Sequence, residues 1–112
     1  MKQTARSVAF AALERCRKTG AWSANSIDAA IRDANLDGRD AALASRLFLG
    51  VLQNSRFCDY YIDHYCAREV EPRVNHILRL GVYQLLFLNK IPPHAAVSES
   101  VTLCRELGMD RA

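Results

Sequence analysis

Cysteine and histidine are the residues of this sequence that could hold a metal ion or act as a nucleophile with its base. Cys58, His64 and Cys66 lie at steps of six and two residues, which does not bring three side chains to one face of a helix. Nothing in the sequence places His76 or His94 beside a cysteine, as a nucleophile–base pair requires. We therefore expect no metal site and cysteines that pack in the core. The four cysteines, none of them in a CxxC pair, are Cys16, Cys58, Cys66 and Cys104.

Paired carboxylates and phosphate-binding loops would be the other signs of catalysis. Glu69 and Glu71 precede an expected helix, where carboxylates favour the positive end of the helix dipole rather than forming an acid–base pair. The sequence has no GxGxxG, Walker or nucleophile-elbow motif. We therefore expect neither a catalytic residue nor a cofactor site in this chain.

The basic residues are unevenly distributed along the chain. The 112 residues include 15 Lys and Arg against 12 Asp and Glu, for a net charge of +3. Residues 1–20 hold five basic residues and one acidic residue, for +4, whereas the other 92 hold ten and eleven, for −1. This asymmetry is typical of a surface that binds a polyanion such as RNA, although a solvated helix face can have the same composition. The five basic residues are Lys2, Arg6, Arg15, Arg17 and Lys18.

Apolar residues at helical spacing predict that six helices position these groups. The first is expected at residues 4–19, with Thr4 as its cap and Gly20 as its end, and the second at about Ser26–Ala34. No stretch alternates with period two between hairpin turns, so we predict one all-α domain over residues 1–112. The other four helices are expected at residues 40–54 with Asp40 as cap, at Cys58–Cys66, at Pro72–Leu88, and from Pro92–Pro93 to about Gly108.

The fifth expected helix is apolar on two sides and should lie at the centre of the domain. Glycine within a helix lowers stability by about 1 kcal/mol relative to alanine, so Gly50 and Gly81 indicate close packing between helices. The residues expected to be buried against the first, third and sixth helices are Leu78, Gly81, Val82 and Leu85. In the sixth helix the side chains expected to face inward are Val97, Val101, Cys104 and Leu107.

The sequence also bears on the compartment of the protein. No apolar run approaches the roughly 18 residues of a membrane span, and the first residues have no signal-peptide cleavage site. Cysteines without a paired spacing such as CxxC are typical of proteins in a reducing compartment. We expect a cytoplasmic protein without a membrane partner.

Three motifs in a fixed order, together with Ala5-Arg6 on the basic first helix, resemble the NusB family of all-α RNA-binding domains over about residues 3–108. The resemblance implies a compact NusB-like helical bundle, here of about six helices. It also implies that a final helix of the family pattern is missing. The motifs are Arg39-Asp40 followed by Leu43, Leu47, Gly50, Val51 and Leu52, then the run Ile77–Leu85, then the run Ile91–Val101.

The resemblance leaves two branches of the family open. One is a free-standing transcription antitermination factor that binds RNA together with a ribosomal protein. The other is the N-terminal domain of a ribosomal RNA 5-methylcytosine methyltransferase. Gln84 after Tyr83, and the Pro-His-Ala-Ala-Val string at 93–97, resemble the methyltransferase branch more closely. The resemblance thus implies an RNA-binding, substrate-positioning domain, whose methyltransferase domain and S-adenosylmethionine pocket lie outside this chain.

The resemblance and the charge together imply a set of RNA contacts to phosphate. Arg79 is included because it lies beside Gly81 in the second motif, with an ion pair to an acid as an equal alternative. Only Lys2 and Arg6 precede the first apolar face, where the antitermination branch has a denser arginine cluster. The expected RNA-binding residues are Lys2, Arg6, Arg15, Arg17, Lys18 and Arg79.

The missing final helix implies an uncovered apolar strip. Soluble monomers rarely expose apolar patches above a few hundred square ångströms, so the strip should bind a second copy or exchange a terminal segment with it. The strip is expected along Val97, Val101, Cys104 and Leu107, or on the far side of Leu86 and Leu88.

Overall fold

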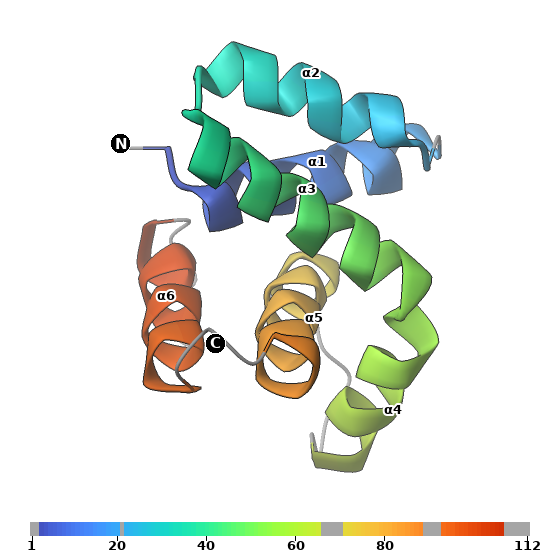
Figure 1. Ribbon diagram of the computed structural model, residues 1–112. Coiled ribbons are helices and arrows are strands. Elements are labelled where there is room, and N and C mark those ends of the chain that lie inside the picture. The colour runs from blue at the N-terminus through green and yellow to red at the C-terminus, as the bar shows by residue number, and fades with distance from the viewer. Residues whose placement is uncertain (1–2, 21, 66–70, 89–92, 107–112) are drawn as a thin grey trace.

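Six helices account for the secondary structure of the residues described by the computed structural model, which are 3–20, 22–65, 71–88 and 93–106 (Figure 1). These ranges hold no β-strand, so the prediction of an all-α domain of about six helices is confirmed. None of the described helices is both long enough and apolar enough to cross a membrane. The helices are α1 (Ala5–Thr19), α2 (Ala24–Ala34), α3 (Gly38–Gln53), α4 (Ser55–Tyr65), α5 (Pro72–Phe87) and α6 (Pro93–Glu106).

The ends of α1 follow from local signals in the sequence. The Thr4 hydroxyl accepts a hydrogen bond from the Ser7 amide at 3.1 Å, and the Ser7 hydroxyl accepts one from the Thr4 amide at 2.8 Å. This reciprocal capping box satisfies two amides at the start of the helix. Gly20 ends the helix at φ 76°, in the left-handed region that glycine adopts without strain.

Three other helix starts differ from the prediction. Helix α2 begins at Ala24, two residues before the predicted start at about Ser26. Asp37, rather than Asp40, caps α3, because its carboxylate accepts the Asp40 amide at 2.8 Å. Helix α4 begins at Ser55, three residues before the predicted start at Cys58. The predicted end of that helix at Cys66 lies outside the described residues.

The helices form two layers (Figure 1). Helices α1, α2 and α3 pack against one another in the first layer, and α5 lies between α4 and α6 in the second. Helices α1 and α3 both pack on α5, so the core lies between the layers. Cys16 and Cys58 are buried in this core, as expected. The largest fully buried apolar side chains are Leu13, Ile27, Leu47, Phe48, Ile77, Leu80 and Val51.

The neighbours of α5 were predicted correctly, but its buried face was not. The helix contacts α1, α3 and α6 as expected, and α4 in addition. Ile77, Leu80 and Tyr83 are its buried apolar residues, whereas Leu85 is 49% exposed. Both sides of this helix are apolar, so periodicity could not decide which side faces α1 and α3. The other predicted core residues of α5, which are only half-buried, are Leu78, Gly81 and Val82.

The inward face predicted for α6 is also wrong. Leu103 is buried, while Val97 is 55% and Val101 44% exposed. Cys104 is half-buried, and Leu107 lies outside the described residues. Leu103 therefore lies in the core, while the two valines line a groove beside α5 and stay partly exposed.

The glycine at position 50 marks the tightest helix contact. A Cβ at Gly50 in α3 would lie closer than 3.0 Å to three atoms of the Tyr83 ring of α5. A Cβ at Gly81 would meet only the Ser100 hydroxyl, at 3.2 Å. Close packing is thus confirmed at Gly50 and is slight at Gly81.

Candidate nucleic-acid interface

The exposed cations of α1 are the residues of this chain best placed to bind phosphate. Arg15 and Lys18 are three residues apart on the helix, and both are exposed. No ion pair joins either side chain to another residue that the structure describes. Their charges are therefore available to a polyanion. Lys2, which was predicted to join them, lies outside the described residues.

Arg6 is held by the opposite layer of the domain. Its Nε donates a hydrogen bond to Oε1 of Gln84 at 2.8 Å, across 78 positions of the sequence. Gln84 is 1% exposed, and its amide nitrogen donates to the Leu80 carbonyl at 2.9 Å. This buried glutamine fixes the direction of the Arg6 side chain. The pairing could not be predicted from the sequence, because nothing local connects the two positions.

Arg17 is engaged by a carboxylate on its own helix. Its Nε and Nη2 donate to the two oxygens of Glu14, each at 2.9 Å. These hydrogen bonds hold the pKa of Glu14 below its ordinary value, despite the burial that acts against ionisation. Glu14 is only 7% exposed, so the pair is partly shielded from solvent. RNA phosphate must compete with this carboxylate for Arg17.

His76 lies behind this ion pair and is almost completely buried. Its Nε2 is 3.7 Å from a Glu14 oxygen, and its Nδ1 has no hydrogen-bond partner among the described residues. Burial, reinforced by the charge of Arg79, lowers the pKa of His76. The ring of Trp22 stacks beside the imidazole, with centroids 6.1 Å apart and planes inclined by 21°. The neutral imidazole of His76 thus packs against one face of the partly exposed indole of Trp22.

The lowered pKa of His76 predicts a loss of stability on mild acidification. The unfolded chain, with an ordinary histidine pKa of 6.5, binds a proton at a pH where the folded protein keeps His76 neutral. The free energy of unfolding therefore falls as the pH drops through 6.5, and this loss stops below the folded pKa. It amounts to at most about 1.4 kcal/mol per pH unit in that interval.

Urea unfolding of the wild type and of His76→Gln between pH 7.5 and 5.5 measures this effect. The variant should show a flatter dependence on pH, while His94→Gln, at an exposed position of α6, should keep the wild-type dependence. If the free energy of unfolding falls equally with pH in the wild type and in His76→Gln, the loss does not come from His76.

Arg79 forms the ion pair that was the alternative to RNA contact. Its Nε and Nη2 donate to the two carboxylate oxygens of Asp59 on α4, each at 2.6 Å. The guanidinium is 19% exposed at the side chain and is held in a fixed plane. Arg79 therefore ties α5 to α4, and only a small part of its side chain is exposed.

Exposed aromatic rings near these cations were not singled out by the sequence. Trp22 is 47%, Phe57 48% and Tyr60 66% exposed. The aromatic richness of α4 was visible, but burial depends on the neighbouring layer and cannot be derived from spacing. Trp22 lies in the connection between α1 and α2, where no periodicity predicts its environment.

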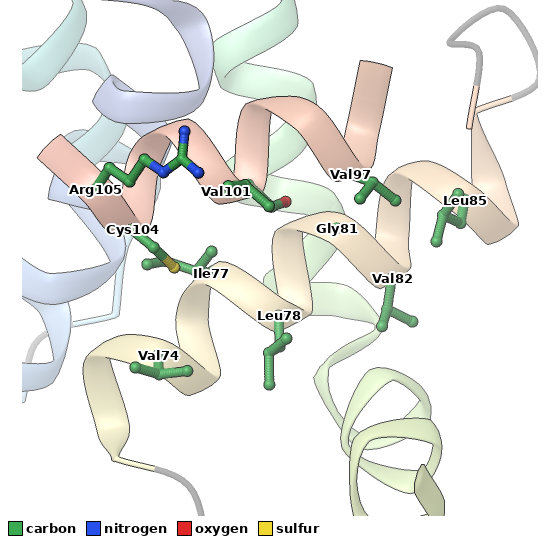
Figure 2. Close-up of a pocket in the computed structure, with 11 residues that line it drawn as sticks. Val74, Ile77, Leu78, Gly81, Val82, Leu85, Val97, Val101, Cys104 and Arg105 are labelled. Atoms are coloured by element: carbon green, nitrogen blue, oxygen red, sulfur yellow. The ribbon is translucent and has the colours of Figure 1, made fainter. Parts of the chain in front are cut away.

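An apolar groove runs between α5 and α6 (Figure 2). It has a volume of about 380 Å³, and Ser100, Cys104 and Arg105 are the residues other than glycine and aliphatic ones that line it. The expected uncovered strip is therefore present at Val97 and Val101, whereas Leu88 is buried. The aliphatic residues that line the groove are Val74, Ile77, Leu78, Val82, Leu85, Val97 and Val101.

Within the described ranges, no three His, Cys, Asp or Glu side chains come together where they could hold a metal ion. Cys58 is buried, and the half-buried Cys104 lies on a different helix. Cys66, the third residue of the metal site considered from the sequence, is outside those ranges.

Two layers of three helices with exposed cations on α1 define the class of this protein, an all-α domain with a basic surface helix. The sequence matches the model of the NusB family over residues 3–112, and the chain belongs to this family. The family resemblance of the three motifs is thereby confirmed.

The curated relatives carry the names of ribosomal RNA methyltransferases. The chain is 32% identical over 111 residues to the probable ribosomal RNA small subunit methyltransferase B of Bacillus subtilis, covering 96% of this chain and 25% of that protein. It is 29% identical over 109 residues to the protein of the same description in Synechocystis, covering 95% and 24%. It is 32% identical over 99 residues to ribosomal RNA small subunit methyltransferase B of Escherichia coli, covering 86% and 22%.

The chain thus spans about a quarter of the length of the curated relatives it matches. These names agree with the methyltransferase branch that Gln84 and the string at 93–97 favoured. No solved structure matches the chain.

Proposed function

We propose that this chain is the RNA-binding, substrate-positioning domain of a cytoplasmic ribosomal RNA (cytosine-5) methyltransferase. The observation that carries the proposal is the pair of exposed, unpaired cations on α1, in a chain whose relatives are named as ribosomal RNA methyltransferases. Arg15 and Lys18 bind phosphates of the RNA, and Arg17 joins them when phosphate displaces Glu14. Such contacts orient an RNA but do not select its sequence.

Catalysis belongs, in this proposal, to a methyltransferase domain of the same protein outside these residues. Among the described residues, the α5–α6 groove is lined mainly by aliphatic side chains, with Ser100, Cys104 and Arg105 beside them, and we assign no S-adenosylmethionine site to it. The part played by this chain is to bind RNA and hold it near that domain.

A salt titration of RNA binding tests the proposal. Each phosphate contact to a single strand contributes about −0.7 to the slope of log affinity against log salt, so two contacts give a slope of about −1.4. The affinity should then fall about sevenfold between 50 mM and 200 mM salt. An affinity for ribosomal RNA fragments that is equal at the two salt concentrations, or the absence of binding at low salt, would show that the proposal is wrong.

We also propose that the α5–α6 groove binds a second copy of this chain. The exposed valines of α6 and Leu85 of α5 form an apolar surface that two-fold symmetry can place against itself. Light scattering over a range of concentrations should show a monomer–dimer equilibrium. Val101→Asp should shift it to monomer, because a carboxylate in the apolar contact loses its hydration. A chain that remains monomeric at the highest concentration contradicts this part of the proposal.

A further inference from the structure

We propose that the surface between the α1–α2 connection and α4 is a stacking site for unpaired bases of single-stranded RNA, with Trp22, Phe57 and Tyr60 as its rings. The inference rests on the proposed function, and it adds the contacts that reach bases rather than phosphates. Stacking of bases on aromatic side chains is a general mode of single-strand recognition, because every base has a flat apolar face.

The three rings line two neighbouring hollows of the surface. Trp22 lines a hollow of about 480 Å³, together with Arg79 and Ser55. Phe57 and Tyr60 line a second hollow, of about 760 Å³. Leu52 and Ser55 line both hollows, so the two hollows adjoin each other. An extended strand can therefore pass from the indole to the rings of α4.

Each ring is already held in place by a neighbouring ring. Trp22 stacks beside the buried His76. Phe57 contacts Phe87 of α5 with centroids 5.7 Å apart, in an edge-to-face arrangement. Tyr60 stacks on His64 with centroids 6.2 Å apart and planes inclined by 11°. Rings that are ordered before binding lose little conformational entropy when a base stacks on them.

Cations stand beside the rings at both hollows. The Arg79 guanidinium is fixed by Asp59 and lines the hollow of Trp22. Arg56, which forms no ion pair with a described residue, lines the hollow of Phe57 and Tyr60. A guanidinium plane can stack on a base, and its charge attracts the adjoining phosphate.

The chemistry of this surface favours RNA over a protein partner. An arginine lines each hollow together with the aromatic rings, and the Ser55 hydroxyl and the Gln53 amide can hydrogen-bond the edges of bases. The α5–α6 groove, by contrast, is lined mainly by aliphatic side chains. The indole also adjoins the phosphate-binding end of α1, because His76 links it to Glu14 and thus to Arg17.

Trp22 is the only tryptophan of the chain, so its fluorescence reports directly on the proposed site. The probe is a single-stranded RNA oligonucleotide of mixed sequence, compared with the same strand annealed to its complement. The single strand should quench the fluorescence and saturate at the concentration found by an independent binding measurement. The duplex, whose bases are already stacked, should leave the fluorescence nearly unchanged.

Variants distinguish the contribution of stacking to RNA affinity from the contribution of charge. Trp22→Ala and Tyr60→Ala should each weaken single-strand binding by about tenfold at constant salt, without changing the salt slope. Trp22→Phe, which keeps a ring, should retain most of the affinity and is the conservative control, and Tyr60→Ala carries the test if Trp22→Ala does not fold. Leu86→Ala truncates a side chain that is 42% exposed and lines neither hollow, and it should bind like the wild type.

The outcomes distinguish this inference from the proposed function. A wild type that binds no RNA at low salt would overturn both. Salt-dependent binding that is unchanged in Trp22→Ala and Tyr60→Ala, with no quenching by the single strand, would overturn the stacking site alone. Equal quenching by single strand and duplex would also overturn it, since a duplex offers no unpaired base.

Discussion

Replacing Gly50 with alanine is expected to lower the free energy of unfolding by about 2 kcal/mol. Alanine is the better helix former by about 1 kcal/mol, so the substitution would stabilise an isolated α3. In the folded protein the new methyl group meets the ring of Tyr83 at less than 3.0 Å. That ring is buried and stacks on Phe87 with centroids 5.3 Å apart, so it has little room to move. Overpacking of about 3 kcal/mol then exceeds the gain in helix propensity.

Denaturant unfolding of paired variants checks this explanation. In a Tyr83→Ala background the collision is absent, and Gly50→Ala should then be neutral or stabilising by up to about 1 kcal/mol. Gly38→Ala is the matched control at the start of the same helix, because a Cβ there meets nothing within 4 Å. A Gly50→Ala protein as stable as the wild type would mean that Tyr83 does not pack against α3.

Reversing the two unpaired charges of α1 is expected to weaken RNA binding by about a hundredfold at low salt. Each phosphate contact to a single strand contributes about a factor of ten at 50 mM salt through counterion release. Arg15→Glu combined with Lys18→Glu removes two such contacts and adds two repulsive charges. Both side chains are exposed and form no ion pair with a described residue, so the fold should be unaffected.

A second double variant controls for net charge. Arg39→Glu combined with Arg46→Glu changes the charge of the protein by the same amount, at exposed positions of α3. The RNA affinity of both variants is measured by filter binding to one RNA at several salt concentrations. The α1 variant should show a clearly shallower salt dependence than the wild type, while the α3 variant should keep most of it. Equal losses would indicate a general electrostatic attraction without a site on α1.

The helices could be predicted wherever their signals are local. The capping box of Thr4 and the left-handed Gly20 depend on residues within one turn, and both ends of α1 were predicted correctly. At the start of α3, two aspartates three residues apart compete for the cap, and the sequence alone favoured Asp40 over Asp37. Local signals of equal strength leave such a boundary undecided.

Burial and pairing across the layers could be predicted only poorly. Leu85 and Leu80 are both apolar residues of one helix, and only the position of α1 and α3 decides that Leu80 is buried. The same limit applies to the candidate site. The Glu14–Arg17 pair has a helical spacing of three and was open to prediction, whereas the Arg6–Gln84 bond spans 78 positions.

The position of α5 between α4 and α6 has a consequence for how the two proposed binding events influence each other (Figure 1). The aromatic hollows open on the α4 side of this helix, and the apolar groove opens on its α6 side. Neither ligand touches the surface that the other occupies, so the coupling free energy between them is close to zero unless α5 itself moves. RNA should therefore have the same affinity for monomer and dimer. A dimer then carries two independent sites and gains strength on a long RNA through avidity, because one strand can reach both copies.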